Sequence, residues 1–177
     1  ALQAVLGALP AKLPVPVLAV LHLPRDRTSR IAEVLAPYCA LPVREAEDKQ
    51  PLQPGTVTFA PPDYHLLVED EGAVALSVDA PVLFSRPAID PLFESAAAVF
   101  GTRVLAILLT GVQSGLRLAL AGAFSSTAHN CRASPLCSAL LCCRQAVRTL
   151  RRARPSEAGW AICYWPAQCC VRRPTRS

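Results

Sequence analysis

The sequence predicts an α/β fold in which helices cover both faces of a doubly wound, mostly parallel sheet. The first observation is two continuous apolar runs, residues 15–22 and 104–110, which are typical of strands buried on both faces. The second is a helical pattern at 89–100, directly before the second run. Strands that alternate with helices build such a sheet, and a β-hairpin predicted at 64–78 forms an excursion from it.

The first predicted element is the end of an amphipathic helix at residues 1–9, where apolar residues recur at helical spacing. Three prolines break this helix, and the strand at 15–22 then ends in His22. Thr28 or Ser29 can cap the following helix. The face that we expect this helix to bury consists of Ile31, Val34 and Leu35.

The middle of the chain has the pattern of short strands joined by turns. The elements expected there are strands at 41–45 and 56–60, a hairpin of 64–68 and 73–78, the helix at 89–100 and the strand at 104–110. Strand periodicity is lost after residue 111. We therefore expect the C-terminal third to be mostly irregular, with possible helices only at 112–124 and 136–150.

Charge and cysteine content divide the chain near the same place. Residues 1–100 carry 7 Lys and Arg against 12 Asp and Glu, whereas residues 101–177 carry 11 Arg and a single acid, Glu157. Seven of the eight cysteines lie between Cys131 and Cys170. We predict a partial α/β domain at 1–111 and an anomalous Arg- and Cys-rich tail at 112–177.

The composition excludes several classes of protein. An apolar fraction of 52% and a charged fraction of 18% exclude wholesale disorder. The uneven charge excludes a uniformly basic nucleic-acid binder, and contact of Arg151–Arg154 with nucleic acid is a minor alternative. The tail cysteines are adjacent or at least five residues apart, not two to four as structural zinc sites need, so zinc is also a minor alternative. We expect no metal and no cofactor.

The longest apolar run is too short to cross a bilayer, and the first residues have no export-signal pattern. We therefore expect no membrane insertion and a cytoplasmic location. The sequence leaves the oligomeric state open.

His22 is the candidate catalytic residue. A histidine at the carboxyl end of a buried parallel strand lies where open α/β sheets place their chemistry. Imidazole also suits a general base near neutral pH, although a hydrogen-bonded structural histidine is the alternative. We interpret His65, within APPDYHLL, as a turn or hairpin residue. The sequence contains neither a G-x-S-x-G nucleophile elbow nor a Gly-rich phosphate loop.

Five segments occur in the order and spacing of one known family. They are VLAVLHLPRD (17–26), ALPVREAEDKQPLQPGTV (40–57), APPDYHLLVEDEG (60–72), FSRPAIDPLFESAAAVFG (84–101) and VLAILLTG (104–111). Together they resemble the CheB-type protein-glutamate methylesterase domain of bacterial chemotaxis, in its stand-alone form. The resemblance covers residues 1–111.

The resemblance implies a Ser hydrolase that removes methyl esters from glutamate side chains of chemoreceptors, and in many members also deamidates glutamines. A Ser attacks the ester, a His takes its proton and an Asp orients the His. The family's V-x-H-x-P setting matches VLHLP, which assigns the base to His22. The family's Ser turn precedes the helix that ends here at residue 9, and its acidic loop has no counterpart after Gly111. We therefore predict no turnover by this chain.

Near residues 111–113 the family resemblance stops, the strand periodicity is lost and the charge changes from acidic to basic. Our hypothesis is a reading-frame shift in the encoding DNA at that point, and a genuinely divergent tail is the competing account. The alternative function is a non-catalytic interaction module that binds receptor or an acidic partner, with the Arg-rich tail adding attraction that salt would weaken.

Overall fold

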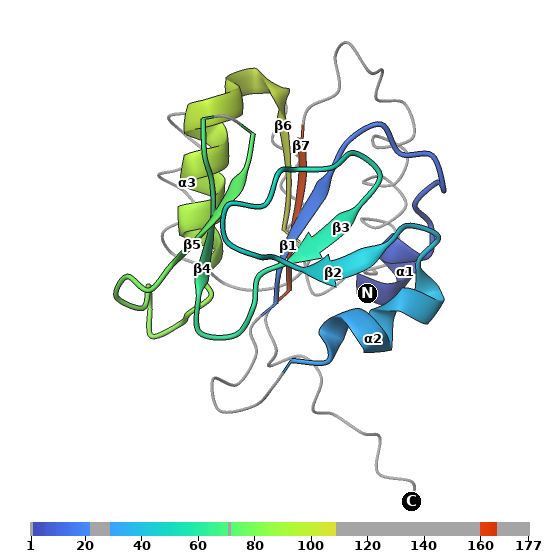
Figure 1. Ribbon diagram of the computed structural model, residues 1–177, viewed down its shortest axis with the longest axis horizontal. Helices are drawn as coiled ribbons and strands as arrows, with labels where there is room; N and C mark the ends of the chain where they lie inside the picture. The colour runs from blue at the N-terminus through green and yellow to red at the C-terminus, as the bar shows by residue number, and fades with distance from the viewer. Residues whose placement is uncertain (1, 22–28, 71, 109–159, 166–177) are drawn as a thin grey trace, which may run out of the picture.

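The computed structural model describes residues 2–21, 29–70, 72–108 and 160–165 (Figure 1). Within these ranges one five-stranded parallel sheet has the strand order β2-β3-β1-β7-β6. Its strands are β1 (Val17–Leu21), β2 (Val43–Glu45), β3 (Val57–Phe59), β6 (Val104–Leu108) and β7 (Trp160–Trp165). The predicted doubly wound, mostly parallel sheet is therefore confirmed.

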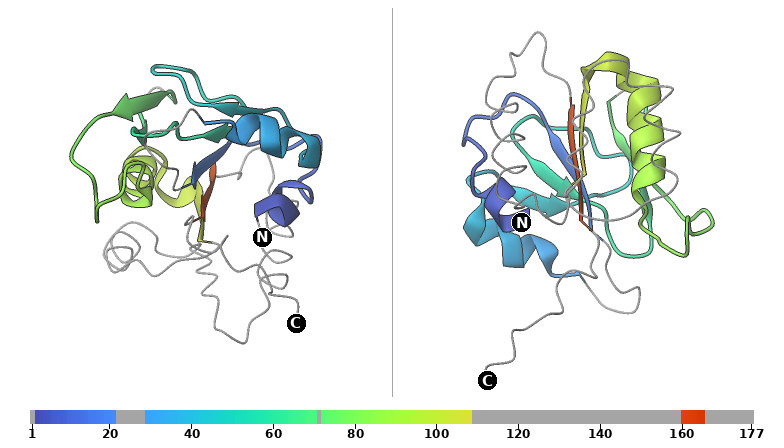
Figure 2. Two further views of the ribbon diagram at one scale, coloured as in Figure 1. Left: turned by 90° about the horizontal axis from the view of Figure 1, so that it is seen from below. Right: turned by 180° about the vertical axis from the view of Figure 1, so that it is seen from behind.

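Helices cover both faces of this sheet (Figure 2). On one face lie α1 (Leu2–Leu6), α2 (Ile31–Leu35) and the 3-10 turn η1 (Ala36–Tyr38). On the other lies α3 (Ile89–Phe100), with the bounds that the sequence predicts. Gly101 ends α3 at φ 55°, a backbone conformation that glycine adopts without steric cost. The 3-10 turn η2 (Gly101–Arg103) then leads into β6.

Two separate apolar cores follow from the alternation of side chains along each strand. Val17 and Ala19 of β1 pack with α1 and α2, whereas Leu18 and Val20 pack with α3. The central strand is thus buried on both faces, which explains why its sequence is a continuous apolar run rather than an alternating one.

The predicted hairpin is present as β4 (His65–Val68) and β5 (Val74–Ser77), which pair antiparallel. It packs beside α3, where Leu66, Val68 and Val74 join the same core as the helix. Ser95 of α3 accepts a hydrogen bond from the backbone N–H of Val68 at 3.0 Å. The hairpin is therefore joined to the helix by both apolar and polar contacts.

Two expectations differ from the structure. Val34 was expected on the buried face of its helix, but it is 54% exposed, because α2 has only five residues and buries Leu35 alone. The second difference is β7, a strand within the part of the chain expected to be irregular. Its apolar sequence WAICYW lies between β1 and β6 and is parallel to both.

Several predictions fall outside the described residues. They are the helices at 112–124 and 136–150, the cap at Thr28 and the domain boundary after residue 111. Of the helices in the described ranges, none has the length and apolar character needed to cross a membrane.

Candidate active site

The carboxyl edge of the sheet is where this fold can build a site. Because all five strands are parallel, Leu21, Phe59 and Leu108 end their strands at the same edge. Helix α3 runs antiparallel to β6 in Figure 1, so the start of the helix lies toward that edge too. The carboxyl ends of these strands and the amino end of α3 thus lie at one edge of the sheet.

The predicted base, His22, lies outside the described residues. Leu21, which precedes it, is the last residue of β1 and half-buried at the carboxyl edge of the sheet. The assignment of His22 as base therefore stays a prediction. His129 and the tail cysteines other than Cys163 also lie outside the described ranges.

Asp90 is a buried carboxyl group in the first turn of α3, at the same edge. Its Oδ1 atom is buried without a hydrogen-bond partner. Burial raises the pKa of Asp90 above its ordinary value of 3.8, and the nearby charge of Glu94 raises it further. The partial positive charge of the helix N-terminus opposes this shift but does not reverse it. Asp90 therefore holds its proton to a higher pH than a solvated aspartate does.

His65 is buried at the start of β4, and both of its ring nitrogens have partners. Nδ1 accepts a hydrogen bond from the backbone N–H of Ala88 at 3.2 Å, so the proton of a neutral ring lies on Nε2. Nε2 is 3.2 Å from the carbonyl oxygen of Ala80, to which it donates. His65 is a structural residue of the hairpin, as the sequence predicts.

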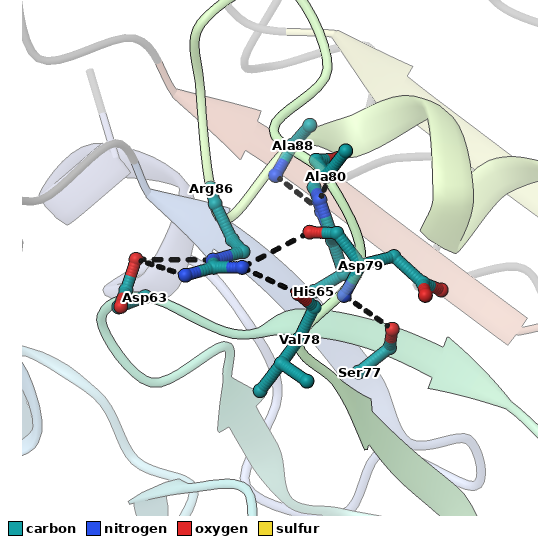
Figure 3. A network of polar contacts seen from close by, with 8 residues as sticks. All are labelled: Asp63, His65, Ser77, Val78, Asp79, Ala80, Arg86 and Ala88. Carbon is teal, nitrogen blue, oxygen red and sulfur yellow. Dashed lines mark hydrogen bonds and ion pairs between the residues drawn. The ribbon is translucent and has the colours of Figure 1, made fainter.

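Arg86 closes a polar bracket beside His65 (Figure 3). Its Nε and Nη2 atoms lie 3.0 and 2.9 Å from Oδ1 of Asp63. Its Nη1 atom donates to the carbonyl oxygens of Val78 and Asp79. One planar guanidinium thus ties the turn before β4 to the segment after β5, a geometry that a lysine cannot reproduce.

Sequence reasoning did not single out Asp90, Arg86 or Asp63. The signal that could have found Arg86 and Asp90 is the segment SRPAID, which leads into the predicted helix at 89–100. Asp63 gives no such signal, because its contact with Arg86 spans 23 positions of the chain. Among the described residues, no group of three or more His, Cys, Asp and Glu side chains could hold a metal ion.

The doubly wound sheet gives the fold class, and the match to a family model gives the class of protein. The chain belongs to the CheB methylesterase family, whose model matches residues 1–117. This is a family of protein-glutamate methylesterases, which are carboxylic-ester hydrolases.

Curated relatives carry the corresponding names. A protein-glutamate methylesterase/protein-glutamine glutaminase of Symbiobacterium thermophilum is 42% identical over 112 residues, which cover 63% of this chain and 31% of that protein. A protein of the same name from Nocardioides sp. is 46% identical over 117 residues, 64% of this chain and 32% of that protein. The chain thus spans about a third of the length of these two relatives.

A solved structure has the same fold. The crystal structure of the Thermotoga maritima CheB methylesterase catalytic domain matches with a TM-score of 0.59 and 33% sequence identity. The match covers 63% of this chain and 61% of that chain.

Proposed function

We propose that the chain carries the core of a protein-glutamate methylesterase that acts on methylated chemoreceptors in the cytoplasm, with glutamine deamidation as a related activity. The observation that carries this proposal is the end of the central strand at Leu21, one residue before His22, at the carboxyl edge of the sheet. The family match over residues 1–117 supports it, and so do the names of the relatives.

The reaction proposed for this family site is acyl transfer. A Ser hydroxyl attacks the carbonyl carbon of the glutamate methyl ester, and His22 takes the hydroxyl proton. Collapse of the tetrahedral intermediate breaks the bond to the methoxy group, which leaves as methanol with the proton from His22. Water, activated by the same imidazole, then hydrolyses the acyl-enzyme to glutamate and free Ser.

The 177 residues do not contain a counterpart of the family's Ser turn, nor an acid in the loop that follows Gly111. We therefore propose that this polypeptide binds methylated receptor without turnover. A polypeptide without the Ser hydroxyl cannot carry out the covalent step, and absence of the orienting acid alone lowers the rate severely in enzymes of this type.

One experiment tests both parts of the proposal. The 177-residue polypeptide is incubated with the methylated cytoplasmic fragment of a chemoreceptor, and complex formation and released methanol are measured. We expect saturable binding and no methanol above a His22→Ala control. Absence of binding would overturn the receptor as substrate, and methanol above the control would overturn the inactivity.

A non-catalytic interaction module is the second candidate function. The observation that favours it is the exposed apolar side chain of Phe84, which is 97% accessible. If the Arg-rich tail drives the binding, the affinity will fall steeply as ionic strength rises. Binding by the α/β domain will depend less on salt.

A further inference from the structure

The segment between β5 and α3 ends in a tight turn with an unfavourable backbone. Val82 and Ser85 exchange two backbone hydrogen bonds, of 3.1 and 2.9 Å, around Leu83 and Phe84. Both central residues have positive φ, 48° for Leu83 and 64° for Phe84. Turns with positive φ at both central positions favour Asn-Gly, because bulky side chains are strained in this region. This chain places two large apolar residues there.

Packing of these side chains within the molecule does not offset the backbone strain. Phe84 is 97% exposed and Leu83 is 55% exposed, and Val78 at the base of the segment is 67% exposed. A side chain that stays in water contributes no burial energy to folding. Strain combined with exposed apolar surface is instead typical of a residue that binds something outside its own chain.

The turn is held on a rigid support. Arg86 binds Asp63 and the carbonyl oxygens of Val78 and Asp79, as Figure 3 shows. His65 binds Ala80 on one side of the turn and Ala88 on the other. We call residues 78–88 the arm. Both stems of the arm are fixed to the start of β4. Because the tip is already ordered, its binding to a partner costs little conformational entropy.

The position of the arm indicates what its tip contacts. Ala88, where the arm ends, is the N-cap of α3, at the carboxyl edge of the sheet. The arm projects outward from the lower part of the molecule in Figure 1. An ester on a protein side chain can reach this edge only if the surrounding surface of that protein lies against the enzyme.

We propose that Leu83 and Phe84 form a docking tip that binds an apolar patch on the methylated receptor, next to the glutamate that enters the site. This inference rests on the proposed function, since it takes the same receptor as the partner. A protein partner fits better than a small molecule, because Phe84 is 97% exposed and Leu83 55% exposed on an arm that projects outward.

The test replaces the tip while keeping the turn. The double variant Leu83→Asn/Phe84→Gly has the sequence that such a turn favours, so it relieves strain and removes the apolar surface. We expect its affinity for the methylated receptor fragment, measured by calorimetry, to fall about tenfold or more. We expect its melting temperature to stay equal or rise.

A second variant and a matched control complete the design. Phe84→Asn removes the ring, keeps Leu83 and introduces a residue that tolerates positive φ. We expect it to lose affinity in the same direction, which keeps the proposal testable even if the double variant folds poorly. Tyr38→Ala removes an exposed aromatic side chain, 53% accessible, from η1 before the amino end of β2. We expect its affinity to match the wild type.

The outcomes separate the two proposals. If the wild type binds and both tip variants bind equally well, the docking tip is wrong and the proposed function stands. An equal loss in Tyr38→Ala also overturns the docking tip, because the effect would not be specific to the arm. If the wild type does not bind the receptor fragment, the proposed function itself fails.

Discussion

The Nδ1 atom of His65 accepts a hydrogen bond from the backbone N–H of Ala88, 23 positions further along the chain. Both residues are buried, and Ala88 is the N-cap of α3. This contact joins the first strand of the hairpin to the start of the helix that faces the carboxyl edge. The buried histidine therefore positions the edge of the site without reacting there.

Replacing His65 by Leu tests this contact. The change leaves the N–H of Ala88 and the carbonyl of Ala80 without their side-chain partner, and a buried polar group without a partner costs about 1–3 kcal/mol. We expect the free energy of unfolding in urea to fall by about that amount. His65→Gln, whose amide can donate and accept, serves as control with a smaller loss. A Leu variant as stable as the wild type would show that water replaces the imidazole.

Arg86→Lys tests the bracket that supports the arm. Lysine keeps the charge, but it cannot contact Asp63 and two carbonyl oxygens with one planar group. We expect a loss of about 1–2 kcal/mol in unfolding free energy and faster proteolysis within residues 78–88. The control is Arg30→Lys, whose ion pair with Glu33 is exposed and should change stability by less than about 0.5 kcal/mol. Equal effects of the two changes would contradict the bracket.

Ser95→Ala tests the contact between hairpin and helix. The hydroxyl accepts from the N–H of Val68 at 3.0 Å and donates to the carbonyl of Pro91 at 2.7 Å. Its removal leaves the N–H of Val68 without that acceptor, so we expect a loss of about 1–3 kcal/mol in urea unfolding. Ser77→Ala removes an exposed contact with the N–H of Asp79 and should cost less. A reversed order of the two losses would exclude this role for Ser95.

Asp90→Asn tests the buried carboxyl group through pH. The pKa of Asp90 is raised in the folded state by burial and by Glu94, so the folded chain binds this proton more tightly than the unfolded chain. Ionisation therefore destabilises the fold as pH rises above the ordinary value of 3.8. We expect the variant to gain melting temperature relative to the wild type at pH 7, and to lose this gain near pH 3.

Glu94→Gln is the companion to this measurement. This change removes the charge of Glu94, which raises the pKa of Asp90 less than burial does. The pH dependence of stability assigned to Asp90 should therefore become smaller without disappearing. A difference between Asp90→Asn and the wild type that is constant from pH 3 to pH 7 would show that the carboxyl group is not perturbed.

Local patterns were sufficient to predict most of the elements. The strands at 15–22 and 104–110, the hairpin and the helix at 89–100 all lie where apolar periodicity predicts them. The prediction for Val34 was wrong because periodicity does not reveal how few turns a helix has. The family was also evident from the sequence, through segments such as SRPAID that hold their order along residues 1–111.

Which distant residues meet could be learned only from the packed fold. Sequence patterns report the period of a helix or strand, which is a local property, whereas a contact such as Asp63 with Arg86 depends on how the whole chain packs. The same holds for β7, whose place between β1 and β6 is a choice among sheet positions that no local pattern encodes. The strain at Leu83 and Phe84 is seen only in their positive φ angles, because two apolar residues in a loop sequence do not by themselves indicate strain. The sequence thus determined the family and the elements, and packing determined the bracket, the arm and the buried carboxyl group of the site.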